Sequence, residues 1–79
     1  MFYTYVLKEM DSNHYYVGST RDLKRRMSEH QSGQNRATKG RTWKLHCYFA
    51  FNEDKIAREF EKYLKTGSGR AFIKRHLNQ

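Results

Sequence analysis

The sequence has little that would cross-link the chain covalently or place it in a membrane. Its single cysteine, Cys47, cannot form an intramolecular disulfide, and no group of cysteines and histidines has the spacing of a zinc site. No apolar run approaches the roughly 18 residues of a membrane span, and the residues after Met1 lack a signal-peptide pattern. We therefore expect a protein of the reducing cytoplasm, with neither a membrane nor a disulfide-linked partner.

Acidic residues are also few. The 79 residues include 16 lysines and arginines but only 8 aspartates and glutamates, so the formal net charge is +8. Aromatic residues make up 15% of the chain, and no low-complexity tail carries the charge. The length allows one domain, over residues 1–79. A basic, aromatic-rich domain suits a nucleic-acid partner, because ion pairs with phosphates supply affinity for any sequence. The alternative is a basic protein without such a partner.

The first part of the chain predicts a β-hairpin. Aromatic and β-branched residues predict a strand over residues 2–8, a turn at residues 11–13 and a second strand over residues 14–17. Opposed residues of an antiparallel pair share a face, so a suitable register places the hydroxyls of Tyr5 and Tyr16 on one surface. The sequence alone leaves that register open.

A helix is expected after the hairpin. The second strand stops at Gly18, Ser19 or Thr20 can cap the helix, and Asp22 suits its first turn. One face carries residues at i, i+3, i+4 and i+7, namely Leu23, Arg26, Met27 and His30. An arginine and a histidine on a face that packs against a sheet suggest a functional role. The alternative is that both lie at the edge of the face, with their polar ends in water.

The second half of the chain predicts a loop, a strand and two further helices. The loop covers residues 32–41, and its basic side chains are candidates for binding a nucleic-acid backbone: Arg36, Lys39 and Arg41. A strand over residues 42–51 is expected to be the most buried, and a helix capped by Asn52 ends at Gly67. A short basic helix over residues 70–77 follows. The expected fold class is α/β (α+β), with a three-stranded antiparallel sheet flanked by two or three helices.

The two tyrosine tripeptides carry a resemblance to a known family. Tyr3-Thr4-Tyr5 lies in the first strand and Tyr16-Val17-Gly18 in the second, and Arg26 and His30 follow in the helix. This arrangement resembles the GIY-YIG nuclease family, especially its small stand-alone members. The resemblance implies a metal-dependent endonuclease that cleaves DNA, with Tyr5, Tyr16, Arg26, His30 and Glu61 as catalytic residues.

The choice of acidic residue also rests on this resemblance. Helical geometry leaves both Glu59 and Glu61 open, because each lies at the margin of the apolar face. The family pattern of an alanine four residues before the metal-binding glutamate, with a Leu-Lys pair after it, selects Glu61. The implied cofactor is a divalent metal ion, Mg²⁺ or Mn²⁺, held by Glu61. The asparagine that many relatives carry after this helix has one candidate here, Asn78.

Two functions from different classes remain open at this stage. The first is an endonuclease for branched, damaged, single-stranded or weakly specified DNA, targeted by the DNA shape or by a protein partner. The second is a non-catalytic nucleic-acid-binding module with the same fold. In either case the basic side chains expected to contact nucleic acid are Arg25, Arg36, Lys39, Arg41, Arg70 and Lys74.

Overall fold

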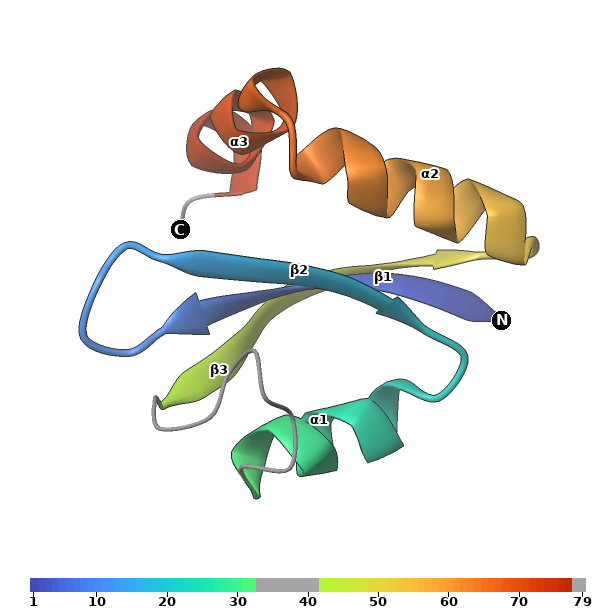
Figure 1. Cartoon of the computed structure of the whole chain (residues 1–79), viewed down its shortest axis with the longest axis horizontal. Coiled ribbons are helices and arrows are strands. Elements are labelled where there is room, and N and C mark those ends of the chain that lie inside the picture. The colour runs from blue at the N-terminus through green and yellow to red at the C-terminus, as the bar shows by residue number, and fades with distance from the viewer. Residues whose placement is uncertain (33–41, 78–79) are drawn as a thin grey trace.

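A three-stranded antiparallel sheet forms the centre of the molecule (Figure 1). The computed structural model describes residues 1–32 and 42–77. The strands are β1 (Phe2–Glu9), β2 (Tyr15–Thr20) and β3 (Trp43–Phe51), in the order β2-β1-β3. The predicted fold class is thereby confirmed.

Helices cover both faces of this sheet. Figure 1 shows α1 (Leu23–Gln31) on one face and α2 (Asp54–Leu64) and α3 (Gly67–Phe72) on the other. A π-helical turn, η1 (Ile73–Leu77), continues directly from α3. Within the described part of the chain, none of these helices is long and apolar enough to cross a membrane.

The central strand β1 is the most buried, with four consecutive buried residues. The prediction that residues 42–51 form the most buried strand was wrong, because β3 lies at an edge and contacts one neighbouring strand. The main core lies between the sheet and α2, α3 and η1, where Thr4 also donates a hydrogen bond to the Ala57 carbonyl at 2.6 Å. Its buried members are Val6, Val17, Leu64 and Ile73.

The second strand is longer than the composition suggested. Pairing with β1 continues through Gly18 and Ser19 to Thr20, so the prediction that the strand stops at the glycine was wrong. The N-cap of α1 is consequently Asp22, whose carboxylate accepts the Arg25 backbone N–H at 3.0 Å. The extra strand residues matter for the site, because they bring the Ser19 side chain beside α2.

The helices of the C-terminal half also end differently from the prediction. The N-cap of α2 is Glu53 and not Asn52, and α2 ends at Leu64, before Gly67. Thr66 then caps α3 by accepting the Gly69 backbone N–H at 3.1 Å, so Gly67 begins a helix and does not end one. The predicted helix over 70–77 is therefore α3 followed by η1.

Candidate active site

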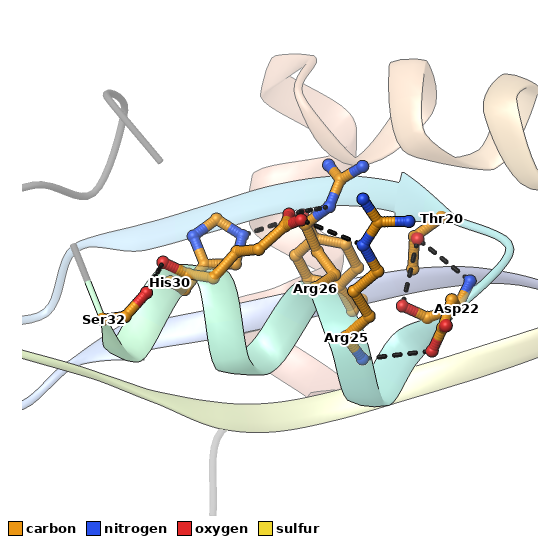
Figure 2. Close-up of polar contacts among 8 residues, drawn as sticks. Thr20, Asp22, Arg25, Arg26, His30 and Ser32 are labelled. Carbon is orange, nitrogen blue, oxygen red and sulfur yellow. Dashed lines mark hydrogen bonds and ion pairs between the residues drawn. The ribbon is translucent and has the colours of Figure 1, made fainter. Parts of the chain in front are cut away.

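Tyr5 of β1 and His30 of α1 form a buried hydrogen-bonded pair. Figure 2 shows His30 on α1 together with Arg26. The Tyr5 hydroxyl lies 3.0 Å from Nε2 of His30, and the two residues are 0% and 4% exposed. Burial, with a smaller contribution from nearby Tyr16, raises the pKa of Tyr5 to about 12. Burial and then the charge of Arg26 lower the pKa of His30. Both groups are therefore neutral at pH 7.

Arg26 also lies within electrostatic range of the Tyr5 hydroxyl. The positive charge of Arg26 lowers the Tyr5 pKa, but by less than burial raises it. The Tyr5 hydroxyl can donate to Nε2 of His30 in the tautomer in which that nitrogen carries no proton. The sequence alternative that places His30 at an edge with its polar end in water is wrong.

The register of β1 and β2 places the two tyrosines on the same face of the sheet. Tyr5 pairs with Gly18 and Leu7 with Tyr16, so the tyrosines are diagonal neighbours with ring centroids 6.4 Å apart. Tyr16 also lies against His30, at 5.3 Å between centroids. A Cβ at Gly18 would lie 2.4 Å from the Tyr5 hydroxyl, so a glycine is required where the tyrosine ring crosses β2.

Arg26 is held by an acidic residue that the sequence reasoning missed. Its Nε lies 3.2 Å from one carboxylate oxygen of Glu29, while the other oxygen lies 3.3 Å from Nε of Arg25. The spacing of i+3 and i+4 on a helix was the available signal. The Arg26 side chain is 36% exposed, so its terminal nitrogens remain accessible to a phosphate.

Glu61 reaches the same region from the opposite face of the sheet. Ser19 donates to one of its carboxylate oxygens and Lys65 to the other, each at 2.6 Å. Burial alone would raise the pKa of Glu61, but these two hydrogen bonds and the charges of Lys65 and Arg26 lower it below its ordinary value. The carboxylate is therefore ionised at neutral pH, within electrostatic range of Arg26.

Glu59, the other candidate, is placed elsewhere. It is exposed and lies with Lys55, Arg58 and Lys62 around a separate surface hollow. Ser19 and Lys65 are the partners of Glu61 that the sequence reasoning did not include in the site. The serine could not be recognised because β2 was expected to end before it.

A divalent metal ion fits this carboxylate by its donor chemistry. Mg²⁺ and Mn²⁺ prefer oxygen ligands, and Mg²⁺ often takes one or two carboxylates together with water and substrate phosphates. Within residues 1–32 and 42–77, no three His, Cys, Asp or Glu side chains gather to hold a metal. Glu61 would thus be the carboxylate ligand, and an ion would either share its oxygens with Ser19 and Lys65 or displace the lysine.

The residues expected to contact nucleic acid fall into two surface regions. Arg25 is exposed on α1 beside Arg26, whereas Arg70 on α3 and Lys74 in η1 are exposed on the other side of the sheet. The remaining candidates lie outside the described residues, as does the candidate family asparagine: Arg36, Lys39, Arg41 and Asn78.

The match to a family model identifies this α+β fold as a small nuclease-type domain. The GIY-YIG catalytic domain matches residues 1–77, and the chain belongs to the GIY-YIG family. It is also similar to the solution NMR structure of the UPF0213 protein BH0048 from Bacillus halodurans. The two are 32% identical, with a TM-score of 0.57, over 94% of this chain and 81% of that one. A comparison with curated proteins gave no match.

Proposed function

We propose that this protein is a metal-dependent endonuclease that hydrolyses DNA phosphodiester bonds, selecting its substrates by DNA structure or damage more than by sequence. The proposal is supported by one observation: the buried Tyr5–His30 pair, the Arg26 guanidinium and the ionised Glu61 carboxylate lie within electrostatic reach of one another. Phosphodiester hydrolysis needs a path for the proton of water, positive charge for the phosphate oxygens and stabilisation of the leaving oxygen.

Tyr5 acts in this proposal as a proton relay. A hydroxyl with a pKa of about 12 stays protonated at neutral pH and is a poor free base. The attacking water gives its proton to the Tyr5 oxygen while the Tyr5 proton moves to Nε2 of neutral His30. Because Tyr5 is fully buried, this step requires that the site opens around the Tyr5 hydroxyl so that the water can reach it. Tyr16, beside both residues, would position the water.

Arg26 supplies positive charge to the scissile phosphate. Its Nε already contacts Glu29, so the two terminal nitrogens are the donors that can fork onto two phosphate oxygens. The contact with Glu29 limits the rotation of the guanidinium and so favours a defined orientation. Charge that builds up on the phosphate oxygens in the transition state is thereby stabilised by a fixed donor.

Glu61 is the proposed carboxylate ligand for Mg²⁺ or Mn²⁺. When bound, such an ion supplies positive charge to the phosphate and to the leaving 3′ oxygen. The low pKa of Glu61 keeps the carboxylate deprotonated for this task. Ser19 fixes the orientation of the carboxylate through its 2.6 Å hydrogen bond, and β2 holds Ser19 in place.

The test replaces Glu61 and compares cleavage with binding. The assay uses flap, junction, nicked and single-stranded DNAs with Mg²⁺ or Mn²⁺. Glu61→Gln should lower cleavage by about 100-fold or more, the size of effect that follows loss of a strong electrostatic contact in an active site. DNA affinity should be unchanged or slightly higher, because a negative charge beside the phosphate is removed.

Glu59→Gln is the matched control, because it makes the same chemical change on the same helix outside the site. It should leave both cleavage and binding nearly unchanged. An inactive Glu59→Gln with an active Glu61→Gln would contradict the choice of carboxylate. Tight binding of several DNAs without cleavage of any would instead indicate the non-catalytic binding module.

A further inference from the structure

A cavity of about 1020 Å³ is lined by residues of β2, β3, α2, α3 and η1. Tyr16 of the candidate active site lines it, as does Lys65, the lysine hydrogen-bonded to Glu61. Arg70, Lys74 and Trp43 also line it. Pockets for small organic ligands are about 300–1,000 Å³, so this volume suffices for a ligand of nucleotide size.

The charge of the lining suits an anion. Three basic side chains line the cavity, those of Lys65, Arg70 and Lys74. Among the described residues, no aspartate or glutamate lines it. Lys65 is bonded to Glu61, but neither Arg70 nor Lys74 has a carboxylate partner among the described residues. Both side chains are exposed, so their charges are accessible to phosphates.

The aromatic part of the lining suits a flat ring. Tyr16 and Trp43 lie edge to face with centroids 6.3 Å apart, and both are only half buried. Nucleobases stack on such side chains when they are unpaired, whereas bases inside a duplex are covered by their neighbours. Val17, Leu64 and Ile73 add apolar side chains to the wall, and Asn13 and His14 add polar ones.

We propose that this cavity binds an unpaired segment of the DNA strand next to the scissile phosphate. A base of this segment lies against Tyr16 and Trp43, and its phosphates contact Arg70 and Lys74. This inference rests on the proposed function and adds a subsite to it. It gives a role to the basic side chains of α3 and η1, and Figure 1 shows α3 on the face of the sheet opposite to α1.

The experiment measures binding without cleavage, in a chelator, so that it does not depend on activity. The probes are a single-stranded DNA, the same strand with abasic sites in place of its bases, and the corresponding duplex. Arg70→Gln combined with Lys74→Gln should weaken binding of both single strands and lower the slope of log affinity against log salt by about 1.4 units. Binding of the duplex should change less.

Trp43→Leu tests the aromatic part separately. It should weaken binding of the intact single strand by about ten-fold, as expected for loss of base stacking, and leave the abasic strand unaffected. Thermal unfolding and NMR spectra of each variant check that the fold is retained. The matched control is Lys55→Gln combined with Lys62→Gln, which removes two charges from the exposed surface of α2 outside the cavity.

Two results would overturn the proposal. The first is a control variant that loses as much single-strand affinity as the Arg70 and Lys74 variant. The second is a Trp43→Leu effect of equal size on the intact and abasic strands. A protein that cleaves none of the DNAs but still shows the expected pattern of binding would contradict the nuclease function and leave the subsite supported.

Discussion

Tyr5 and His30 have pKa values shifted in opposite directions, and both shifts keep the pair uncharged. A charged imidazolium or tyrosinate would lie in a region that is almost inaccessible to solvent, which is costly. The pair can therefore accept one proton and pass it on, but it has little capacity to hold a charge permanently. The charges of the site belong instead to Arg26, Glu29 and Glu61, which are more exposed.

Replacement of Arg26 tests whether its role lies in the transition state. Arg26→Lys keeps the positive charge but loses the forked geometry that contacts two phosphate oxygens. We expect the single-turnover rate of DNA cleavage to fall by about 100-fold, whereas DNA affinity changes only a few-fold. Rapid-quench kinetics and a binding titration measure the two quantities separately.

Arg25→Lys is the control for this change. Arg25 shares Glu29 with Arg26, but it is far more exposed and makes no contact with Tyr5 in the described structure. Its replacement should alter the cleavage rate by less than about three-fold, as for most exposed side chains outside a site. Equal losses of cleavage rate in Arg25→Lys and Arg26→Lys would contradict the catalytic role of the Arg26 guanidinium.

For single residues, the sequence predicted which candidate site residues lie close together, but not which neighbouring side chains hold them in place. Alternation along a strand is a strong geometric rule, so the shared face of Tyr5 and Tyr16 could be expected once a register was assumed. The contacts of Ser19 and Glu29 with the site depend on where β2 ends and on how α1 is rotated. Neither quantity is encoded in a local pattern of residues.

The short segment between the end of α2 at Leu64 and the start of α3 at Gly67 positions the C-terminal basic residues over the sheet. Thr66 caps α3, and Gly69 then lies directly against the end of α2. A Cβ at Gly69 would lie 1.9 Å from the Tyr63 carbonyl oxygen and 2.4 Å from the Leu64 Cα. These are backbone atoms, so a rotamer change cannot relieve the contact.

Gly69→Ala should therefore move α3 away from α2 and lower the free energy of unfolding by about 1–3 kcal/mol, the usual cost of overpacking. Gly67→Ala is the matched control, because nothing lies within 4 Å of a Cβ at that position. Alanine there should be neutral or stabilise the protein by up to about 1 kcal/mol, since it restricts the unfolded chain. Denaturant unfolding measures both, and equal effects would contradict the close packing.

The number and order of elements could largely be predicted, but their burial could not. Partial alternation followed by an apolar run suggested that residues 42–51, and hence β3, would be the most buried strand. Burial depends on which strand is central, and the order β2-β1-β3 arises from pairing between distant segments. The same limitation applies to α3, whose start is decided by the Thr66 cap and by close packing at Gly69 and not by helix propensity.

For the molecule as a whole, folding and the candidate chemistry draw on the same buried groups. Tyr5 belongs to the set of fully buried side chains of the central strand and also to the proposed proton relay. Its raised pKa therefore affects the stability of the entire fold. An unfolded chain releases the Tyr5 proton near pH 10, whereas the folded protein keeps it up to about pH 12.

The stability of the protein should consequently decline in alkali. The contribution from Tyr5 is fully present below pH 10 and is lost as the pH rises from 10 to about 12, because the unfolded state ionises first. The difference between the pKa of Tyr5 in the folded and the unfolded protein corresponds to roughly 2–3 kcal/mol of stability. Tyr5→Phe should remove this part of the decline, whatever its effect on stability at neutral pH. Urea unfolding at a series of pH values measures the decline in stability.

Tyr48→Phe is the control: it removes a hydroxyl from an exposed tyrosine of β3 and should keep the decline. If the wild type and Tyr5→Phe lose stability equally over this range, the burial of Tyr5 does not control its ionisation, and the reason for treating it as a neutral relay is lost.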